Sequence, residues 1–225
     1  MKLIMGKNNY PGKLIVFCGL DGSGKTTLIN YLNDYLCKLS LNPILTKQPT
    51  PDMRNNHIFR VFQDQDNKEN FDYRALSLMA ASDRLQHNKS VIIPALEQGK
   101  TIVSDRYFYS CLANLQSRGY MEDIWIYDIA KNIPLPNLSF FLDIDVDEAI
   151  RRVRKRPDEK ERYIDVELQY KLRENYLKIA EAIGGIIIRT DNTVNESFCV
   201  VRNSIDNLFL IGEEWNGIIE DIGYH

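Results

Sequence analysis

Eight consecutive residues near the N-terminus have the types and spacing needed to bind phosphate. Residues 19–26 read GLDGSGKT and fit the pattern G-x-x-x-x-G-K-[ST]. The glycines permit a backbone that points N–H groups at phosphate oxygens, Lys25 would neutralise the β- and γ-phosphates, and the Thr26 hydroxyl would bind Mg²⁺. The expected ATP-binding residues are Gly19, Gly22, Ser23, Gly24, Lys25, Thr26 and Thr27.

The sequence on either side of this loop favours a functional phosphate site over a chance glycine-rich turn. An apolar run at residues 14–18 predicts a buried strand before the loop, and an amphipathic stretch at residues 26–39 predicts a helix after it. Such a loop is shared by GTPases, ATPases, nucleoside kinases and nucleotide kinases. GTPases usually carry N/T-K-x-D, and the nearest segments, TKQP at 46–49 and NKEN at 67–70, do not end in Asp. The sequence therefore disfavours a GTPase switch.

Three further charged residues could hold a metal ion and a second substrate that accepts a phosphoryl group. Asp105 and Arg106 follow an apolar run at residues 101–104, and in an open α/β sheet ligands bind beyond the carboxyl ends of the strands. Asp105 could hold Mg²⁺ through water, while Arg106 could clamp a phosphate. A strand-end salt bridge is an equally good explanation of this pair. Arg84 lies within a helical pattern and, taken alone, is better explained as a solvated charge.

The segment 151–162, RRVRKRPDEKER, is strongly basic. It holds seven basic and three acidic residues, a local charge of +4 in a chain of net charge -3. A nucleic-acid patch is disfavoured, because aromatic residues are not interleaved and the chain is acidic overall. One alternative is a solvated helix end; the other is a lid whose arginines close over the transferring phosphoryl group. Pro157 would end the preceding helix and provide a break.

The pattern of the whole chain predicts the elements that position these residues. Short apolar runs alternate with longer amphipathic stretches, which predicts a three-layer, doubly wound α/β fold with a five-stranded parallel sheet. The expected strands are 14–17, 44–46, 101–104, 139–142 and 186–188. The expected helices lie within 26–39, 73–98, 147–155, 166–183 and 194–210.

Bulk properties predict one soluble domain. The chain has 225 residues, 44% of them hydrophobic and 26% charged, and its four cysteines show no disulfide or zinc-site spacing. No signal peptide or membrane-spanning run is evident, so we expect a cytoplasmic protein without nucleic-acid or membrane partners. The expected organisation is a flexible N-terminus (1–12), a kinase-like domain (13–211) with a lid at about 151–165, a surface loop at 64–70 and a tail at 212–225.

Several motifs in order resemble the thymidylate kinase family of P-loop nucleoside monophosphate kinases, over roughly residues 13–210. They are GLDGSGKTT at 19–27, DRLQH at 83–87, IIPALEQGKTIVSDRYFYS at 92–110, RKRPDEKERY at 154–163 and LRENYLKIA at 172–180. The resemblance implies transfer of a phosphoryl group from ATP, with Mg²⁺, to dTMP, a small-molecule nucleotide. It also implies that a homodimer is possible.

The resemblance assigns roles to individual positions. Asp21 resembles the family residue near the acceptor 3′-hydroxyl, Arg106 the arginine that grips the acceptor phosphate, and Arg84 the arginine that contacts the thymine ring. Ser110 lies where family members contact the base. Some family members place a basic residue inside the phosphate loop, where this chain has Gly22 and Ser23. The resemblance then implies a catalytic cation from the lid, with Arg156 and Arg162 as candidates and Arg154 as a further possibility.

Three departures from the family pattern concern the acceptor. Ala80 stands where many members have a phenylalanine that stacks on thymine, Asn114 where a tyrosine crowds the 2′ position, and Lys47-Gln48-Pro49 where Arg-Glu-Pro is usual. Losing a stacking ring would cost about 1 kcal/mol. Possible replacements for the ring are Phe59, Phe62, Phe71 and Tyr109.

The sequence thus predicts a kinase that phosphorylates dTMP and leaves three alternatives open. One is a kinase for another pyrimidine or modified nucleotide, or for a nucleoside. The second is a P-loop ATPase or switch without an acceptor. The third is a non-catalytic nucleotide-binding module, which the intact Lys25, Thr26 and Asp105 disfavour.

Overall fold

A computed structural model describes residues 2–63 and 72–210, with side chains except those of residues 61–63. The predicted loop at 64–70 and the tail at 212–225 lie outside the described residues. None of the helices in the described part of the chain combines the length and apolar composition needed to cross a membrane.

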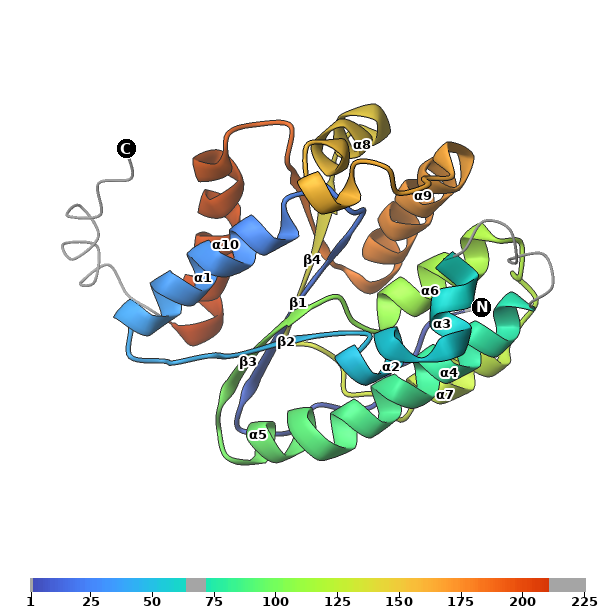
Figure 1. The fold of residues 1–225 in the computed structure, drawn as a ribbon. Coiled ribbons are helices and arrows are strands. Elements are labelled where there is room, and N and C mark those ends of the chain that lie inside the picture. Colours follow the sequence, from blue (N-terminus) through green and yellow to red (C-terminus); the bar gives the residue numbers. More distant parts are fainter. Residues whose placement is uncertain (1, 64–71, 211–225) are drawn as a thin grey trace.

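Five parallel strands form the sheet in the described part of the chain, as the sequence predicted; Figure 1 shows their arrangement. Their order is β2-β3-β1-β4-β5, so β1 lies at the centre with the phosphate loop at its carboxyl end. The strands are β1 (Lys13–Gly19), β2 (Ile44–Lys47), β3 (Thr101–Asp105), β4 (Leu138–Asp143) and β5 (Ile186–Arg189). Because β3 and β4 flank β1 on opposite sides, their carboxyl ends lie on either side of the loop.

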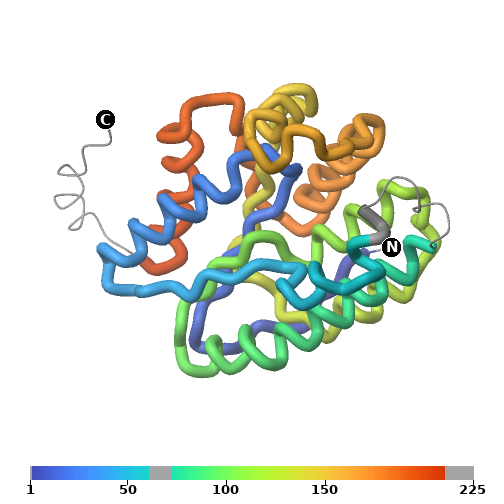
Figure 2. Tube along the Cα trace, viewed as in Figure 1, coloured from blue at the N-terminus to red at the C-terminus, as the bar shows by residue number. Residues whose placement is uncertain are grey.

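Helices cover both faces of this sheet (Figure 1). Helices α1 (Lys25–Lys38) and α10 (Val194–Phe209) pack together on one face although they are far apart in sequence, as the blue and red segments of Figure 2 show. The other face carries α4 (Tyr73–His87), α6 (Phe108–Ser117) and α9 (Val166–Ile183). The remaining helical segments are α2 (Pro51–Asn55), α3 (His57–Gln63), a π turn (Asn88–Ile92), α5 (Ile93–Glu97), α7 (Trp125–Ala130), α8 (Val146–Arg154) and a 3₁₀ turn (Pro157–Glu159).

The central strand explains why the three layers form. Side chains alternate between the faces of a strand, and β1 is apolar at every position from Leu14 to Cys18. Leu14 and Val16 pack under the α4–α6–α9 layer, while Ile15 and Phe17 pack under α1 and α10; all four are fully buried. A strand that is apolar on both faces needs helices on both sides, so the alternation of elements specified the layers.

Candidate active site

The phosphate loop has the backbone geometry that its glycines predicted. Gly22 and Gly24 have positive φ angles of 84° and 88°, values that L side chains adopt at a cost. A Cβ atom at Gly22 would lie 2.2 Å from the carbonyl oxygen of Ala149. Helix α1 begins at Lys25 directly after Gly24, which has no side chain to cap it. The N–H groups of its first turn are therefore oriented to bind an anion.

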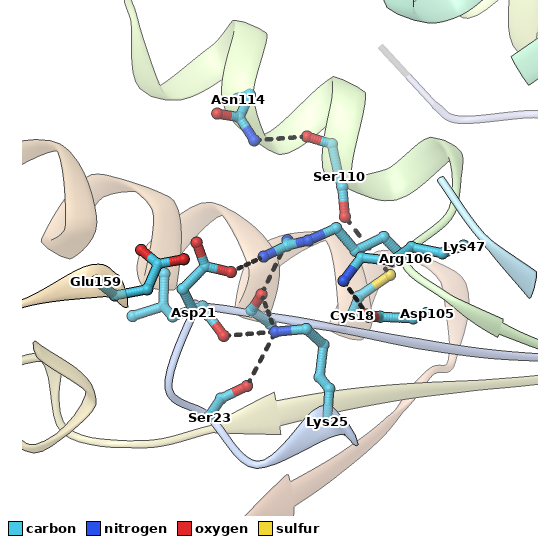
Figure 3. Close-up of polar contacts among 12 residues, drawn as sticks. Cys18, Asp21, Ser23, Lys25, Lys47, Asp105, Arg106, Ser110, Asn114 and Glu159 are labelled. Carbon is cyan, nitrogen blue, oxygen red and sulfur yellow. Dashed lines mark hydrogen bonds and ion pairs between the residues drawn. The ribbon is translucent and has the colours of Figure 1, made fainter. Parts of the chain in front are cut away.

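Lys25 lies inside this loop (Figure 3). Its side chain is 7% exposed, and Nζ donates hydrogen bonds to the carbonyl oxygens of Gly19 (3.1 Å) and Leu20 (2.5 Å). Burial, and then the positive charge of Arg106, lower the pKa of Lys25 to about 7. A nucleotide phosphate would add negative charge beside this amine and favour its protonated form.

Arg106 connects the loop to the other side of the site. It has a positive φ of 69°, and its N–H donates to the carbonyl oxygen of Phe17 (2.8 Å). Its guanidinium donates to Gly19 O (3.1 Å) and to Asp21 Oδ1 (2.5 Å); Figure 3 shows the contact with Asp21. The Arg106 charge lowers the pKa of Asp21 well below its ordinary value. The loop and the end of β3 are thus joined by a charged contact.

A large cavity separates the loop from α4 and α6. Its volume is about 1200 Å³, and both Arg84 and Arg106 line it together with Asp21 and Ser110. Arg84 is 3% exposed, with Nη1 donating to Ala80 O (2.8 Å) and Nε to Tyr107 O (3.4 Å). Arg84 is therefore a buried residue of the cavity wall rather than the solvated helix charge that the sequence alone favoured.

Asp105 and Thr26 are suited to a hard divalent cation. Asp105 Oδ2 pairs with Lys47 Nζ at 2.9 Å, while Oδ1 is buried and has no hydrogen-bond partner among the described residues. The Thr26 side chain is exposed at the start of α1. No group of three or more acidic, His or Cys residues in the described part could cage a metal ion. Mg²⁺ commonly binds through one or two protein ligands, water and substrate phosphates, and this donor set fits it.

One of the predicted lid arginines contacts the loop. Arg162 Nη2 donates to Asp21 Oδ2 at 3.1 Å, and Arg162 Nε pairs with Glu159 at 2.9 Å. Arg154 instead donates to the carbonyl oxygen of Lys160, and Arg156 is exposed and is absent from the described cavity lining. Arg162 is thus the only one of the three candidates placed at the phosphate loop.

The cavity wall shows the consequences of the family departures. Ala80 and Phe59 both line the cavity, so Phe59 can supply an aromatic face there. Tyr109 was a wrong suggestion, because it is fully buried and packs against Phe141 in the core. Phe71 lies outside the described residues, as does the side chain of Phe62. Asn114 donates to Ser110 O at 2.9 Å and accepts from Arg118 at 3.2 Å.

Arg54 and Tyr176 are polar residues of the cavity that the sequence analysis did not assign to the site. Arg54 on α2 lines the cavity and donates through Nε to Pro49 O at 2.9 Å. Tyr176 on α9 accepts a hydrogen bond from Arg106 Nη1 at 3.0 Å. Tyr176 lies within the LRENYLKIA motif, which offered a signal, whereas the segment around Arg54 carries no recognised pattern.

Comparison with known proteins gives a consistent result. A family model described as Thymidylate kinase matches residues 17–199. A protein of Pyrococcus horikoshii named "Probable thymidylate kinase" is 39% identical over 172 residues, covering 76% of this chain and 83% of the relative. Another of that name from Thermococcus kodakarensis is 37% identical over 207 residues, covering 89% and 99%. A "Thymidylate kinase" of Sulfurihydrogenibium is 36% identical over 187 residues, covering 82% and 91%.

Proposed function

The chain belongs to the thymidylate kinase family, and we propose that it transfers the γ-phosphoryl group of ATP to dTMP, forming ADP and dTDP. An oxygen of the dTMP phosphate attacks the γ-phosphorus, and the bond from that phosphorus to the β–γ bridging oxygen breaks. Such a transfer needs little covalent help from the protein, so its residues act by position and charge.

On the donor side, the residues of the phosphate loop hold the triphosphate. The N–H groups at the start of α1 and the ammonium of Lys25 neutralise the β- and γ-phosphates. Thr26 would hold Mg²⁺ directly and Asp105 would hold it through water; when bound, the ion neutralises charge on the phosphates. Arg162 supplies a cation from the lid, since it already contacts the loop at Asp21.

On the acceptor side, arginines hold the nucleotide. Arg106 and Arg54 bind its phosphate, Arg84 and Ser110 contact its base, and Asp21 orients its sugar. All five residues line one cavity. Ala80 is smaller than the phenylalanine found at this position in many family members, and the added space in the cavity would accommodate pyrimidines other than thymine.

One observation carries this proposal: the guanidinium of Arg106 contacts both Gly19 and Asp21 of the loop while lining the same cavity as Arg84. A phosphorylated molecule in that cavity would lie between the loop and both arginines. An ATPase without an acceptor does not need Arg84 and Arg106 in a cavity next to the phosphate loop.

A panel of acceptors tests the proposal. ADP formation is followed with ATP, Mg²⁺ and each of dTMP, dUMP, dCMP, UMP, 5-hydroxymethyl-dUMP and thymidine. Fast turnover with dTMP supports the proposal, and turnover only with another monophosphate or with thymidine assigns a different acceptor. ATP hydrolysis that is indifferent to every acceptor identifies an ATPase, and tight ATP binding without turnover identifies a binding module.

Two further properties are proposed from the family resemblance and the composition. The chain is expected to form a homodimer, which light scattering after gel filtration would test. It is expected to act in the cytoplasm, which imaging of a tagged chain would test.

A further inference from the structure

The hydroxyl of Tyr176 links three elements around the acceptor cavity. Tyr176 lies on α9 and is 4% exposed. Its oxygen accepts a hydrogen bond from Arg106 Nη1 (3.0 Å) and donates one to Ser110 Oγ on α6 (3.0 Å). Its ring packs near Phe141 of β4, with a centroid separation of 6.4 Å. A guanidinium can only donate, which fixes the direction of the first hydrogen bond and leaves the tyrosine proton available for Ser110.

The guanidinium of Arg106 has hydrogen-bond partners in the phosphate loop and a partner on α9, and the charged loop partner, Asp21, is held less firmly than Tyr176. Gly19 and Asp21 belong to the phosphate loop; the Gly19 carbonyl accepts from Nη1, the nitrogen that also donates to Tyr176, and the Asp21 carboxylate accepts from Nη2. The side chain of Asp21 is 45% exposed and also pairs with Arg162 of the lid. Asp21 therefore has a competing partner and access to solvent, whereas Tyr176 is buried and held by the core.

Both the backbone and the side chain of Arg106 must be held in place by surrounding contacts if its guanidinium is to point into the cavity. The positive φ of 69° is unfavourable for a non-glycine residue, so the surrounding contacts must hold this conformation. An arginine side chain has four rotatable torsions, and each one left free lowers the fraction of molecules in which the guanidinium points into the cavity. A buried hydroxyl at 3.0 Å restricts those torsions.

We propose that Tyr176 is a positioning residue, whose hydroxyl holds the Arg106 guanidinium in the orientation that receives the acceptor phosphate. The inference rests on the proposed function and adds a residue to it. Because α9 begins at Val166, directly after the expected lid at 151–165, Tyr176 also ties the acceptor-binding arginine to the helix that follows the lid.

The substitution Tyr176→Phe tests this role, because it removes one oxygen and keeps the ring. The KM for dTMP is expected to rise about tenfold or more, the value expected for losing a hydrogen bond to a charged group, while the KM for ATP stays unchanged. Tyr170→Phe is the matched control: it deletes the same atom on the same helix, but Tyr170 is 46% exposed and its hydroxyl donates to Asp147 at 3.3 Å. This variant is expected to keep both KM values.

A double-mutant cycle separates positioning from a merely structural role. If Tyr176 acts through Arg106, then adding Tyr176→Phe to Arg106→Ala should not weaken dTMP binding further, as measured by calorimetry. An unchanged dTMP KM in Tyr176→Phe, equal increases in both KM values, or a full additional loss in the Arg106→Ala background would each overturn the inference. Failure of the proposed function is distinct: there the unaltered protein itself would form no ADP in response to dTMP.

Discussion

The two sides of the cavity are built in different ways. On the donor side, the phosphate loop is one continuous segment, residues 19–26, and most of its expected contacts with the triphosphate come from backbone N–H groups. The acceptor side is assembled from separate elements: Arg54 on α2, Arg84 on α4, Arg106 after β3, and Tyr176 on α9. Arg106 and Asp21, 85 positions apart in the sequence, meet at the boundary between the two sides.

This difference determines which amino-acid substitutions each side of the cavity tolerates. A backbone cradle is set by φ angles and by close approach of main-chain atoms, so it should fail when a glycine gains a side chain. An assembled wall is set by hydrogen bonds between side chains, so it should fail one contact at a time. Substitutions on the two sides are expected to separate ATP binding from acceptor binding.

The largest expected effect is on the donor side. Lys25→Met removes the only side-chain ammonium of residues 19–26, so kcat should fall by about 10³-fold, the range seen when one electrostatic contact to a transition state is removed. Turnover is measured by coupled ADP detection, and folding by thermal unfolding. The fold should persist, because methionine keeps the apolar stem of the side chain.

The control for this variant is acceptor binding. Calorimetry with dTMP should give the same Kd as the unaltered protein, since Lys25 Nζ contacts only loop residues among the described contacts. Normal turnover in Lys25→Met would contradict the donor-side assignment.

The second largest effect is expected on the acceptor side. Arg106→Ala should weaken dTMP binding by about 10²-fold, because it removes a charged partner of the acceptor phosphate from a mostly buried position. The Kd for ATP should change far less, and both are measured by calorimetry. Equal losses for the two ligands would show that Arg106 supports the loop instead of the acceptor.

The same contrast explains how much the sequence could predict. Strand β1 and residues 19–26 were predictable because their pattern is local: a run of apolar residues, glycines at fixed spacing, then Lys25. Arg84, taken alone, was wrongly interpreted as a solvated charge, since its burial depends on α6 and on Tyr107, which are distant in sequence. Arg54 was missed for the same reason. Its place in the cavity depends on α2, which Thr50 caps and which Asp83 of α4 holds through Thr50 N at 3.0 Å.

A glycine substitution tests the backbone character of the donor side. An alanine at Gly22 would combine a positive φ of 84° with a Cβ only 2.2 Å from Ala149 O, so we expect a loss of about 1–3 kcal/mol in stability, ATP affinity or both. Urea unfolding measures the loss in stability, and calorimetry measures the loss in ATP affinity. Gly99→Ala is the control, since Gly99 has a positive φ of 74° but nothing within 4 Å of its Cβ position. Equal losses in both variants would attribute the effect to φ alone.

The smallest expected effect concerns the support of the acceptor side by His87. Its ring is 8% exposed and lies between Thr46 Oγ1 (2.9 Å) and Gln48 Nε2 (3.0 Å), so it holds the end of β2. Burial lowers the pKa of His87 below its ordinary value of 6.5, outweighing nearby Asp83, which raises it. The unfolded chain then binds more protons than the folded one just below pH 6.5, and the free energy of unfolding should fall as the pH drops through that value.

His87→Gln should flatten this dependence between pH 5 and 7, because glutamine can hydrogen bond to Thr46 and does not titrate in that range. Urea unfolding at several pH values measures the slope, and identical slopes in the two proteins would contradict a role for His87. The affinity for dTMP should also fall as the pH drops through 6.5, and less so in His87→Gln, since the chain after β2 carries Arg54 into the cavity. The affinity for ATP should not change in this way, because the phosphate loop is held by β1 and α1. A parallel change in ATP affinity would mean that the two sides of the cavity are not independent.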